Sequence, residues 1–155
     1  MFEDYLSVIA QGIPTSLLLT FASLLIAFLL ALLFTFILAM GNSWLKSAVN
    51  FYLVLFTGTP LLIQIFLIYS GPGQFEFITQ SPLWSLLSNA WFCAMLALAL
   101  NSAAYSTQLF YGAVKAIPQG QWESCAALGL SRVQTLKILS PYALKRALPS
   151  YTNEI

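Results

Sequence analysis

Residues 15–40 read TSLLLTFASLLIAFLLALLFTFILAM, a run of 26 residues without one charged side chain. About 20 apolar residues in a helix cross the hydrocarbon core of a bilayer, so this run can span a membrane with some tilt. Pro14 precedes the run and Gly41 follows it, which suits the start and the end of a helix. The stretch therefore predicts a transmembrane helix that opens near Pro14.

The composition of the whole chain is typical of a membrane protein. Hydrophobic residues make up 59% of the 155 residues and charged residues only 7%, whereas soluble domains carry about 25% charge. Residues 51–70 and 83–114 form two further uncharged runs. Backbone polar groups in lipid must be satisfied within the protein, and no alternating strand pattern is present, so both runs should be helical. We predict an all-α membrane protein with three spans in these residues.

The distribution of charge predicts the orientation of the spans. Five of the six basic residues follow the third run, and Lys46 lies between the first and second runs. The connection between the second and third runs contains one charged residue, Glu76. Because basic residues are retained in the cytoplasm, residues 1–11 should be periplasmic and the segment after Val114 cytoplasmic. The N-terminus has no basic residue, so the first run should be a retained span and not a signal peptide.

The last residues predict that the domain continues. After Pro141, the side chains of Leu148, Pro149 and Tyr151 are typical of the start of another membrane segment. Three helices alone would make a poor bundle. We expect the complete domain to extend beyond Ile155.

The sequence lacks the residues that catalysis or metal binding would need. It has no histidine, no phosphate loop of the form GxxxxGK[S/T] and only scattered acidic residues. Cys93 and Cys125 lie in different surroundings and suit packing better than a disulfide or a metal site. The net charge of +1 gives no reason to expect nucleic-acid binding. We therefore expect no catalytic residue, no metal and no cofactor bound by this chain.

Polar residues interrupt the second and third runs. Gly58 and Pro60 should break or kink the second run, because glycine frees the backbone and proline removes a donor. Asn101, Tyr105 and Gln108 share one helix face in the third run. Such groups either hydrogen-bond between helices or line a substrate path. The candidate path residues are Thr57, Thr59, Gln64, Asn101 and Gln108.

A polar hairpin, residues 120–136 with the sequence GQWESCAALGLSRVQTL, follows the third run. Pro118 can occupy the first turn of a helix, and Gly129 is a natural stop. Ser131 and Gln134 fit a capping box for a second helix, which should run to about Leu139 and end or kink near Pro141.

Small side chains dominate the first helix of this hairpin. They let another backbone approach closely, while Trp122 and Glu123 offer one aromatic ring and one charge. The helix either docks into a groove of a cytoplasmic partner or lies on the lipid surface, and the lack of a basic amphipathic face favours docking. The candidate docking residues are Trp122, Glu123, Ser124, Cys125, Ala126, Ala127 and Gly129.

Three motifs resemble a known family. The ESCAALG segment of residues 123–129 resembles the E-A-A-x-x-x-G loop of binding-protein-dependent ABC importer permeases, with Ser124 and Cys125 in place of two alanines. The segments TGTPLLIQ (residues 57–64) and NSAAY (residues 101–105) resemble polar amino-acid permeases, although Thr57 replaces an arginine and Gln108 a glutamate. The resemblance covers residues 12–155 and is closest to arginine-type permeases of Gram-negative bacteria.

This resemblance implies a type I ABC importer transmembrane domain with a core of about five spans, here ending after three spans and the coupling loop. It implies that a coupling loop, residues 115–140, docks on cytoplasmic ATPase subunits that bind ATP and Mg²⁺. A second permease subunit and a periplasmic amino-acid-binding protein would complete the transporter in the inner membrane. The implied substrate is arginine, with histidine, lysine or glutamine as alternatives. The competing interpretation is a membrane scaffold without transport activity.

Overall fold

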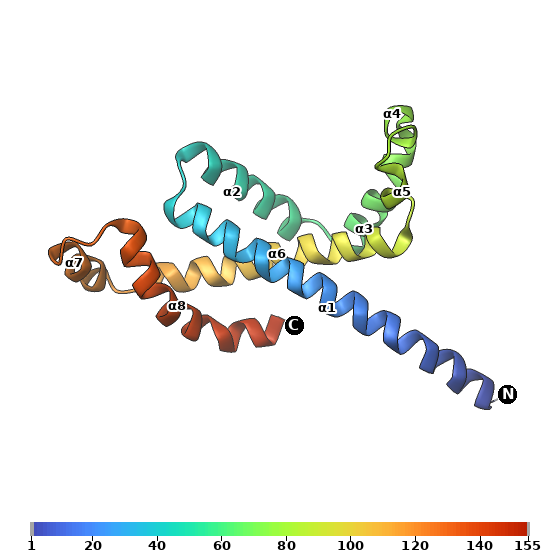
Figure 1. The fold of residues 1–155 in the computed structure, drawn as a ribbon, viewed down its shortest axis with the longest axis horizontal. Helices are drawn as coiled ribbons and strands as arrows, with labels where there is room; N and C mark the ends of the chain where they lie inside the picture. The colour runs from blue at the N-terminus through green and yellow to red at the C-terminus, as the bar shows by residue number, and fades with distance from the viewer. Residues whose placement is uncertain (1, 155) are drawn as a thin grey trace. The chain divides into compact units, whose positions relative to one another are not determined.

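The computed structural model describes residues 2–154, and the side chains of residues 12–153. These residues form helices and no strand. The elements are α1 (Phe2–Met40), α2 (Ser43–Gly58), α3 (Leu61–Ser70), the 3-10 turn η1 (Pro72–Gln74), α4 (Glu76–Thr79), α5 (Trp84–Leu87), α6 (Ala90–Lys115), α7 (Gln119–Ala127) and α8 (Arg132–Glu154). Figure 1 shows their order along the chain.

Helix α1 is the clearest membrane span. Within its residues Gly12–Met40, the most apolar stretch of 18 residues has a mean hydropathy of 2.8, and only 17% of that stretch is buried inside the protein. Large side chains such as Leu18 and Phe21 are 61% and 70% exposed, as expected for a surface in contact with lipid. The helix begins at Phe2 and contains Pro14. The predicted start near Pro14 is therefore wrong, because one missing backbone donor does not end so long an apolar helix.

The other two predicted spans are less continuously apolar than α1. Helices α2 and α3 reach the length and apolarity of a span only when they are taken together as one broken segment. Helix α6 has 26 residues, but polar residues from Asn101 to Gln108 lower its hydropathy, and among the described residues it does not count as a span by itself. The number of crossings therefore stays a prediction.

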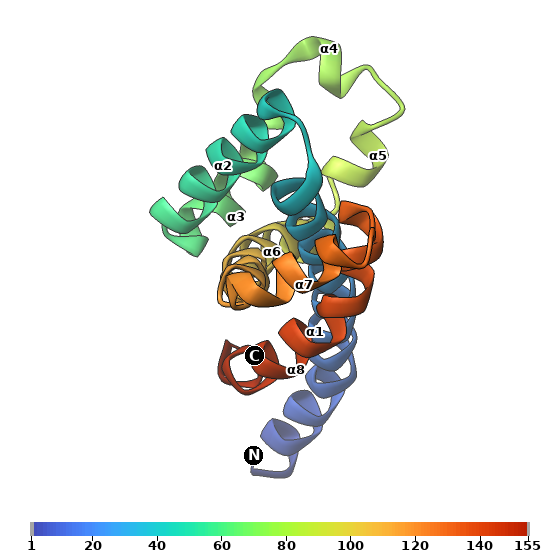
Figure 2. The same ribbon diagram turned by 90° about the vertical axis from the view of Figure 1, so that its left-hand side faces the viewer.

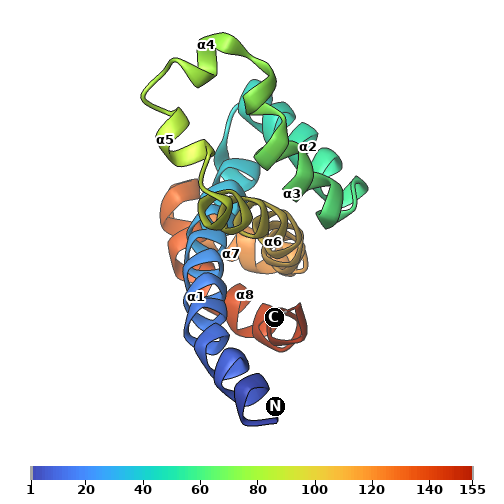
Figure 3. The same cartoon turned by 90° about the vertical axis from the view of Figure 1, so that its right-hand side faces the viewer.

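By its internal contacts the chain divides into two units. The first comprises residues 2–27 and 59–102. After α3 the chain passes through the short helices α4 and α5 before α6 begins (Figure 3). Asn89 caps α6, because its Oδ1 accepts hydrogen bonds from the backbone amides of Trp91 at 2.9 Å and Phe92 at 3.3 Å. Side-chain caps of this kind fix where the helix starts.

The second unit comprises residues 28–58 and 103–154. Asn42 caps α2 in the same way, with its Oδ1 2.9 Å from the amide of Leu45. Helix α2 packs beside the C-terminal part of α1 (Figure 1), where Leu38, Val49, Leu53 and Ala104 form a buried cluster. A second cluster joins α1, α6 and α8 through Ala31, Phe110 and Ala147. Small residues at these contacts let the helices approach closely.

Helix α8 differs from the prediction. It does not end near Pro141 but continues to Glu154 with Pro141 and Pro149 inside it, and it changes direction along its length (Figure 1). Pro141 cannot donate to the carbonyl of Lys137, and the Ser140 hydroxyl donates to that oxygen instead at 3.3 Å. This substitute bond helps the helix to pass the proline.

Candidate functional site

The turn between α7 and α8 has the geometry that its residue types demand. Helix α7 ends at Ala127, and Gly129 has a φ of +74°, a left-handed conformation that L side chains rarely adopt. The amide of Leu130 donates to the Cys125 carbonyl at 3.1 Å, and the amide of Gly129 to the Ala126 carbonyl at 2.9 Å. These two bonds make a Schellman motif, so the predicted stop at Gly129 is confirmed.

The capping box at the start of α8 is also present. The Ser131 amide donates to Gln134 Oε1 at 2.9 Å, and the Gln134 amide donates to Ser131 Oγ at 3.4 Å. The Ser131 hydroxyl adds a donor to the same Gln134 oxygen at 2.9 Å. Helix α7 begins at Gln119, so Pro118 is its N-cap residue and not, as predicted, a residue of its first turn. Helix α7 thus lies beside the start of α8 in a fixed hairpin (Figure 2).

The hairpin divides the candidate docking residues between its inner and outer faces. Trp122 is half-buried against a cluster of Ile117, Leu139 and Ala143, and Cys125 is buried. These two side chains hold α7 to its own unit. The residues left exposed are Glu123, Ser124, Ala126, Ala127 and Gly129. The outer face is therefore small-sided, with one carboxylate and with Leu128, 78% exposed, at its tip.

Gln119 is a part of this face that the sequence analysis missed. Its Nε2 donates to Glu123 Oε1 at 2.9 Å, one helical turn away. The spacing of four residues is the signal that could have revealed it. The bond restrains the only carboxylate of the outer face, so the carboxylate has a preferred orientation before any partner binds.

The second candidate site lies at the break between α2 and α3. Helix α2 ends at Gly58 and α3 begins at Leu61, which confirms the predicted break at Gly58 and Pro60. Thr59 lies at this break, and its carbonyl oxygen accepts a hydrogen bond from a side chain. Gln64, only 6% exposed, donates to this carbonyl at 2.9 Å and to Thr59 Oγ1 at 2.7 Å. A buried side chain thus satisfies the backbone that the break exposes.

Asn101 of α6 completes this polar cluster. Its Nδ2 donates to Gln64 Oε1 at 3.1 Å. The structure therefore brings three of the five candidate path residues together within the first unit: Thr59, Gln64 and Asn101. We call these three residues the amide cluster. It contains no charged side chain, so it can contact a ligand only through neutral amide and hydroxyl groups.

Thr57 and Gln108 belong to the second unit. The Thr57 hydroxyl donates to the Leu53 carbonyl at 2.8 Å, and the Tyr105 hydroxyl donates to the Thr57 carbonyl at 3.4 Å. Gln108 is exposed. The link from Tyr105 to Thr57 was not predicted, because no local pattern connects residues so far apart in the sequence.

Comparison with known proteins places these features in a family. Residues 28–155 match the family model described as binding-protein-dependent transport system inner membrane component. The chain is 79% identical over 155 residues to the arginine ABC transporter permease protein ArtM of Haemophilus influenzae, covering 100% of this chain and 68% of that protein. It is 60% identical over 156 residues to ArtM of Escherichia coli, covering 100% of this chain and 70% of that protein.

A solved structure supports the fold. A crystal structure of an amino acid ABC transporter with histidines matches with a TM-score of 0.81 and 29% identity, covering 99% of this chain and 68% of that one. The resemblance and the all-α fold class expected from the motifs are both confirmed. The chain belongs to the family of inner membrane components of binding-protein-dependent transport systems.

Proposed function

We propose that this chain is a permease subunit of an ATP-driven importer that carries arginine across the bacterial inner membrane. The identity of 79% over the full chain with a protein named as an arginine permease is the observation that carries this proposal. The permease subunit is not itself the ATPase, and the chain has no phosphate loop. The ATP and Mg²⁺ would be bound by a partner subunit, and we expect no catalytic activity in this chain.

The outer face of α7 is the proposed contact with that ATPase. Its small side chains permit close approach of a partner backbone, and the hydrogen bond from Gln119 orients the Glu123 carboxylate. The Schellman turn and the capping box give the hairpin a fixed shape, which lowers the entropic cost of docking. The coupling loop would then transmit movement of the ATPase subunits to the membrane helices through Trp122 and Cys125, the side chains of α7 that are turned toward the rest of their own unit.

The proposed topology follows the charges. All six basic residues fall on one side if the chain crosses the membrane three times, which makes the coupling loop cytoplasmic and the N-terminus periplasmic. A periplasmic binding protein would deliver the amino acid, and a second permease subunit would complete the path. The amide cluster offers only neutral groups, so any carboxylate that neutralises a cationic substrate would come from another part of the transporter.

Uptake measurements test the substrate. The full-length chain, reconstituted with its ATPase and binding protein in proteoliposomes, should import radiolabelled arginine only when ATP is present. Unlabelled histidine, lysine and glutamine should each compete more weakly than unlabelled arginine. Preferred import of another amino acid would overturn the choice of arginine, and uptake without any dependence on ATP would overturn the importer itself in favour of a scaffold.

Co-purification tests the coupling role of α7. Replacing Glu123 with alanine should reduce both ATPase co-purification and uptake by about tenfold, a loss of about 1.4 kcal/mol that is typical of one charged interface contact. The matched control is Glu76→Ala, which removes an exposed glutamate from α4 and should leave ATPase association unchanged. Equal association of the ATPase with both variants would refute docking through Glu123.

A further inference from the structure

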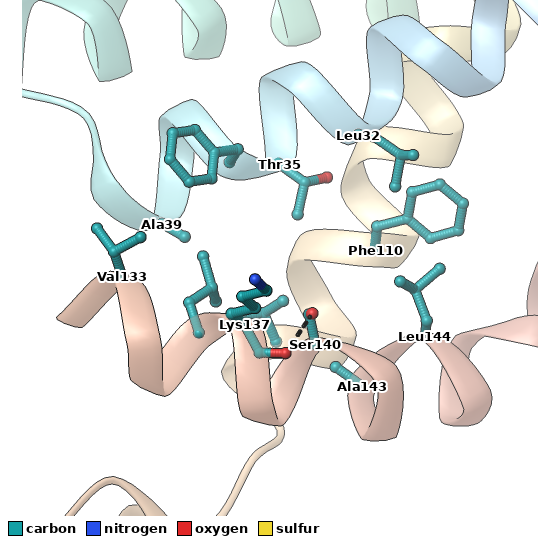
Figure 4. A pocket seen from close by; sticks show the side chains of 12 residues that line it. Leu32, Thr35, Ala39, Phe110, Val133, Lys137, Ser140, Ala143 and Leu144 are labelled. Atoms are coloured by element: carbon teal, nitrogen blue, oxygen red, sulfur yellow. Dashed lines mark hydrogen bonds between the residues drawn. The ribbon is translucent and has the colours of Figure 1, made fainter. Parts of the chain in front are cut away.

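The second unit contains a cavity that neither the coupling role nor the substrate path uses. It has a volume of about 370 Å³ and lies between α1, α6 and α8 (Figure 4). This volume falls in the range of about 300–1,000 Å³ that is typical of small-molecule sites. Most of its wall is apolar, formed by side chains such as Leu32, Phe36, Phe110, Val114, Leu136 and Leu144. An apolar group is therefore the natural filling for most of this space.

Polar groups occur at a few points of the wall. Lys137 lines the cavity, and Figure 4 shows its amine directed from α8 toward α1. Among the side chains of residues 12–153, the structure has no ion pair to this amine. Thr35 also lines the cavity, and its hydroxyl oxygen is buried without a hydrogen-bond partner among the described residues. A buried hydroxyl without a partner is unfavourable, so an acceptor supplied by a ligand would stabilise it.

The charge of the cavity wall, where Lys137 is the one charged lining residue, and the charge of the unit as a whole both favour an anion. The second unit carries all six basic residues of the sequence, whereas its acidic residues are Glu123 and Glu154. A ligand that suits both the wall and the amine must combine an apolar chain with a negative group. A free inorganic anion would leave the apolar wall unfilled, and a neutral hydrocarbon would provide no counter-charge for the exposed Lys137 ammonium at the edge of this wall.

We propose that this cavity binds an anionic phospholipid of the surrounding bilayer. One acyl chain would occupy the apolar space, the phosphate would lie against the Lys137 ammonium, and the Thr35 hydroxyl would donate to an ester oxygen. Phospholipid is available to every inner membrane component, and basic pockets between membrane helices are a recurrent mode of anionic headgroup binding. The proposal does not depend on which amino acid is transported.

Native mass spectrometry of the purified transporter, with full-length chain and partner subunits, tests this site. Phosphatidylglycerol added to the detergent-solubilised complex should be retained as a stoichiometric adduct. Lys137→Gln should weaken its retention about fivefold, as expected for one basic residue at a membrane surface. The matched control is Lys145→Gln, which removes the same charge from a second exposed lysine of α8 that does not line the cavity, and it should leave retention unchanged. Equal retention by the two variants would overturn the proposal.

Three further measurements identify the occupant. Ala39→Phe, which places a ring in the cavity wall, should abolish retention of phosphatidylglycerol while the complex still assembles. Phosphatidylcholine should be retained less than phosphatidylglycerol, and millimolar inorganic phosphate should not displace the adduct. Equal retention of both lipids, displacement by phosphate, or cross-links showing a second copy or a later segment of the chain in the cavity would each refute the lipid assignment.

Discussion

The α7–α8 hairpin and the amide cluster are both polar, but the hairpin is held by hydrogen bonds between residues close in sequence, and the cluster depends on a hydrogen bond between distant residues. Every bond that shapes the hairpin joins residues at most five positions apart, such as the Leu130 amide and the Cys125 carbonyl. In the amide cluster, Asn101 reaches Gln64 across 37 positions of sequence. The hairpin is therefore defined by local backbone geometry, whereas the cluster exists only when α3 and α6 are packed together.

This difference separates the two sites by their expected response to mutation. The hairpin keeps its partner-facing side chains exposed, so a change to one of these side chains alters docking more than folding, whereas a change to the turn glycine or to the capping serine alters folding. The amide cluster is centred on the buried Gln64, with Thr59 and Asn101 half-buried around it, so a change there removes hydrogen bonds that the unit needs for its own stability.

Gln64→Leu should have the largest effect. The substitution leaves the Thr59 carbonyl and the Asn101 amide without the partner that Gln64 provides, at a cost of about 2 kcal/mol of unfolding free energy. Unfolding in mixed micelles measures this loss. Gln74→Leu, at an exposed position in η1, is the control and should change stability by less than about 0.5 kcal/mol.

A double-mutant cycle sharpens the same point. Combining Gln64→Ala with Asn101→Ala should reveal a coupling free energy of about 0.6 kcal/mol or more, as measured for hydrogen bonds between membrane helices. Additive effects of the two substitutions would show that the cluster does not act as one unit.

Gly129→Ala should cause the second largest loss of unfolding free energy. Apart from its two neighbours in the chain, no residue has an atom within 4 Å of the position that the Cβ would occupy, so the penalty comes from the left-handed backbone, about 1.5 kcal/mol. Gly120 lies inside α7 and also has open space around it, so Gly120→Ala should instead stabilise the helix by about 0.5–1 kcal/mol. A loss of stability from both substitutions would mean that crowding, and not backbone conformation, is decisive at these positions.

The same contrast explains what the sequence could predict. The stop at Gly129 and the cap at Ser131 follow from residue types a few positions apart, and both are confirmed. The break at Pro60 was predicted for the same reason, but the hydrogen bond from the Gln64 side chain to the Thr59 carbonyl at this break was not predicted. The pairing of Gln64 with Asn101 depends on how two helices pack, and helical periodicity alone does not specify that.

The errors also have a common physical origin. The sequence placed helix boundaries at Pro14 and near Pro141, but α1 and α8 continue through both prolines. Proline is a strong breaker in water, where the freed carbonyl is readily solvated. In the apolar run of α1 the helix is kept at Pro14 because the alternative exposes more backbone groups to lipid. At Pro141 in α8 the hydroxyl of the neighbouring Ser140 donates to the carbonyl that lost its backbone donor. The partial burial of Trp122 could not be predicted from the sequence either, because it depends on contacts with α8.

Ser131→Ala tests the capping box and should lower stability by about 1 kcal/mol, because it removes the side-chain acceptor of the Gln134 amide and one donor to Gln134 Oε1. The effect should be confined to the start of α8 and should be visible as faster amide hydrogen exchange there. Ser150→Ala, at an exposed position within α8, is the control and should not accelerate exchange in the hairpin.

Gln119→Ala should have the smallest effect on stability. Its bond to Glu123 is exposed and spans one helical turn, so its loss should lower the unfolding free energy by about 0.3 kcal/mol. If the hydrogen bond orients the carboxylate for the ATPase, the same substitution should nevertheless weaken ATPase binding severalfold, because the freed side chain must be ordered again on docking. Titrating the ATPase against the full-length variant measures this effect. Unchanged affinity would show that Glu123 needs no orientation by Gln119, whereas a large loss of stability would show that the outer face of α7 is part of the fold and not only a docking surface.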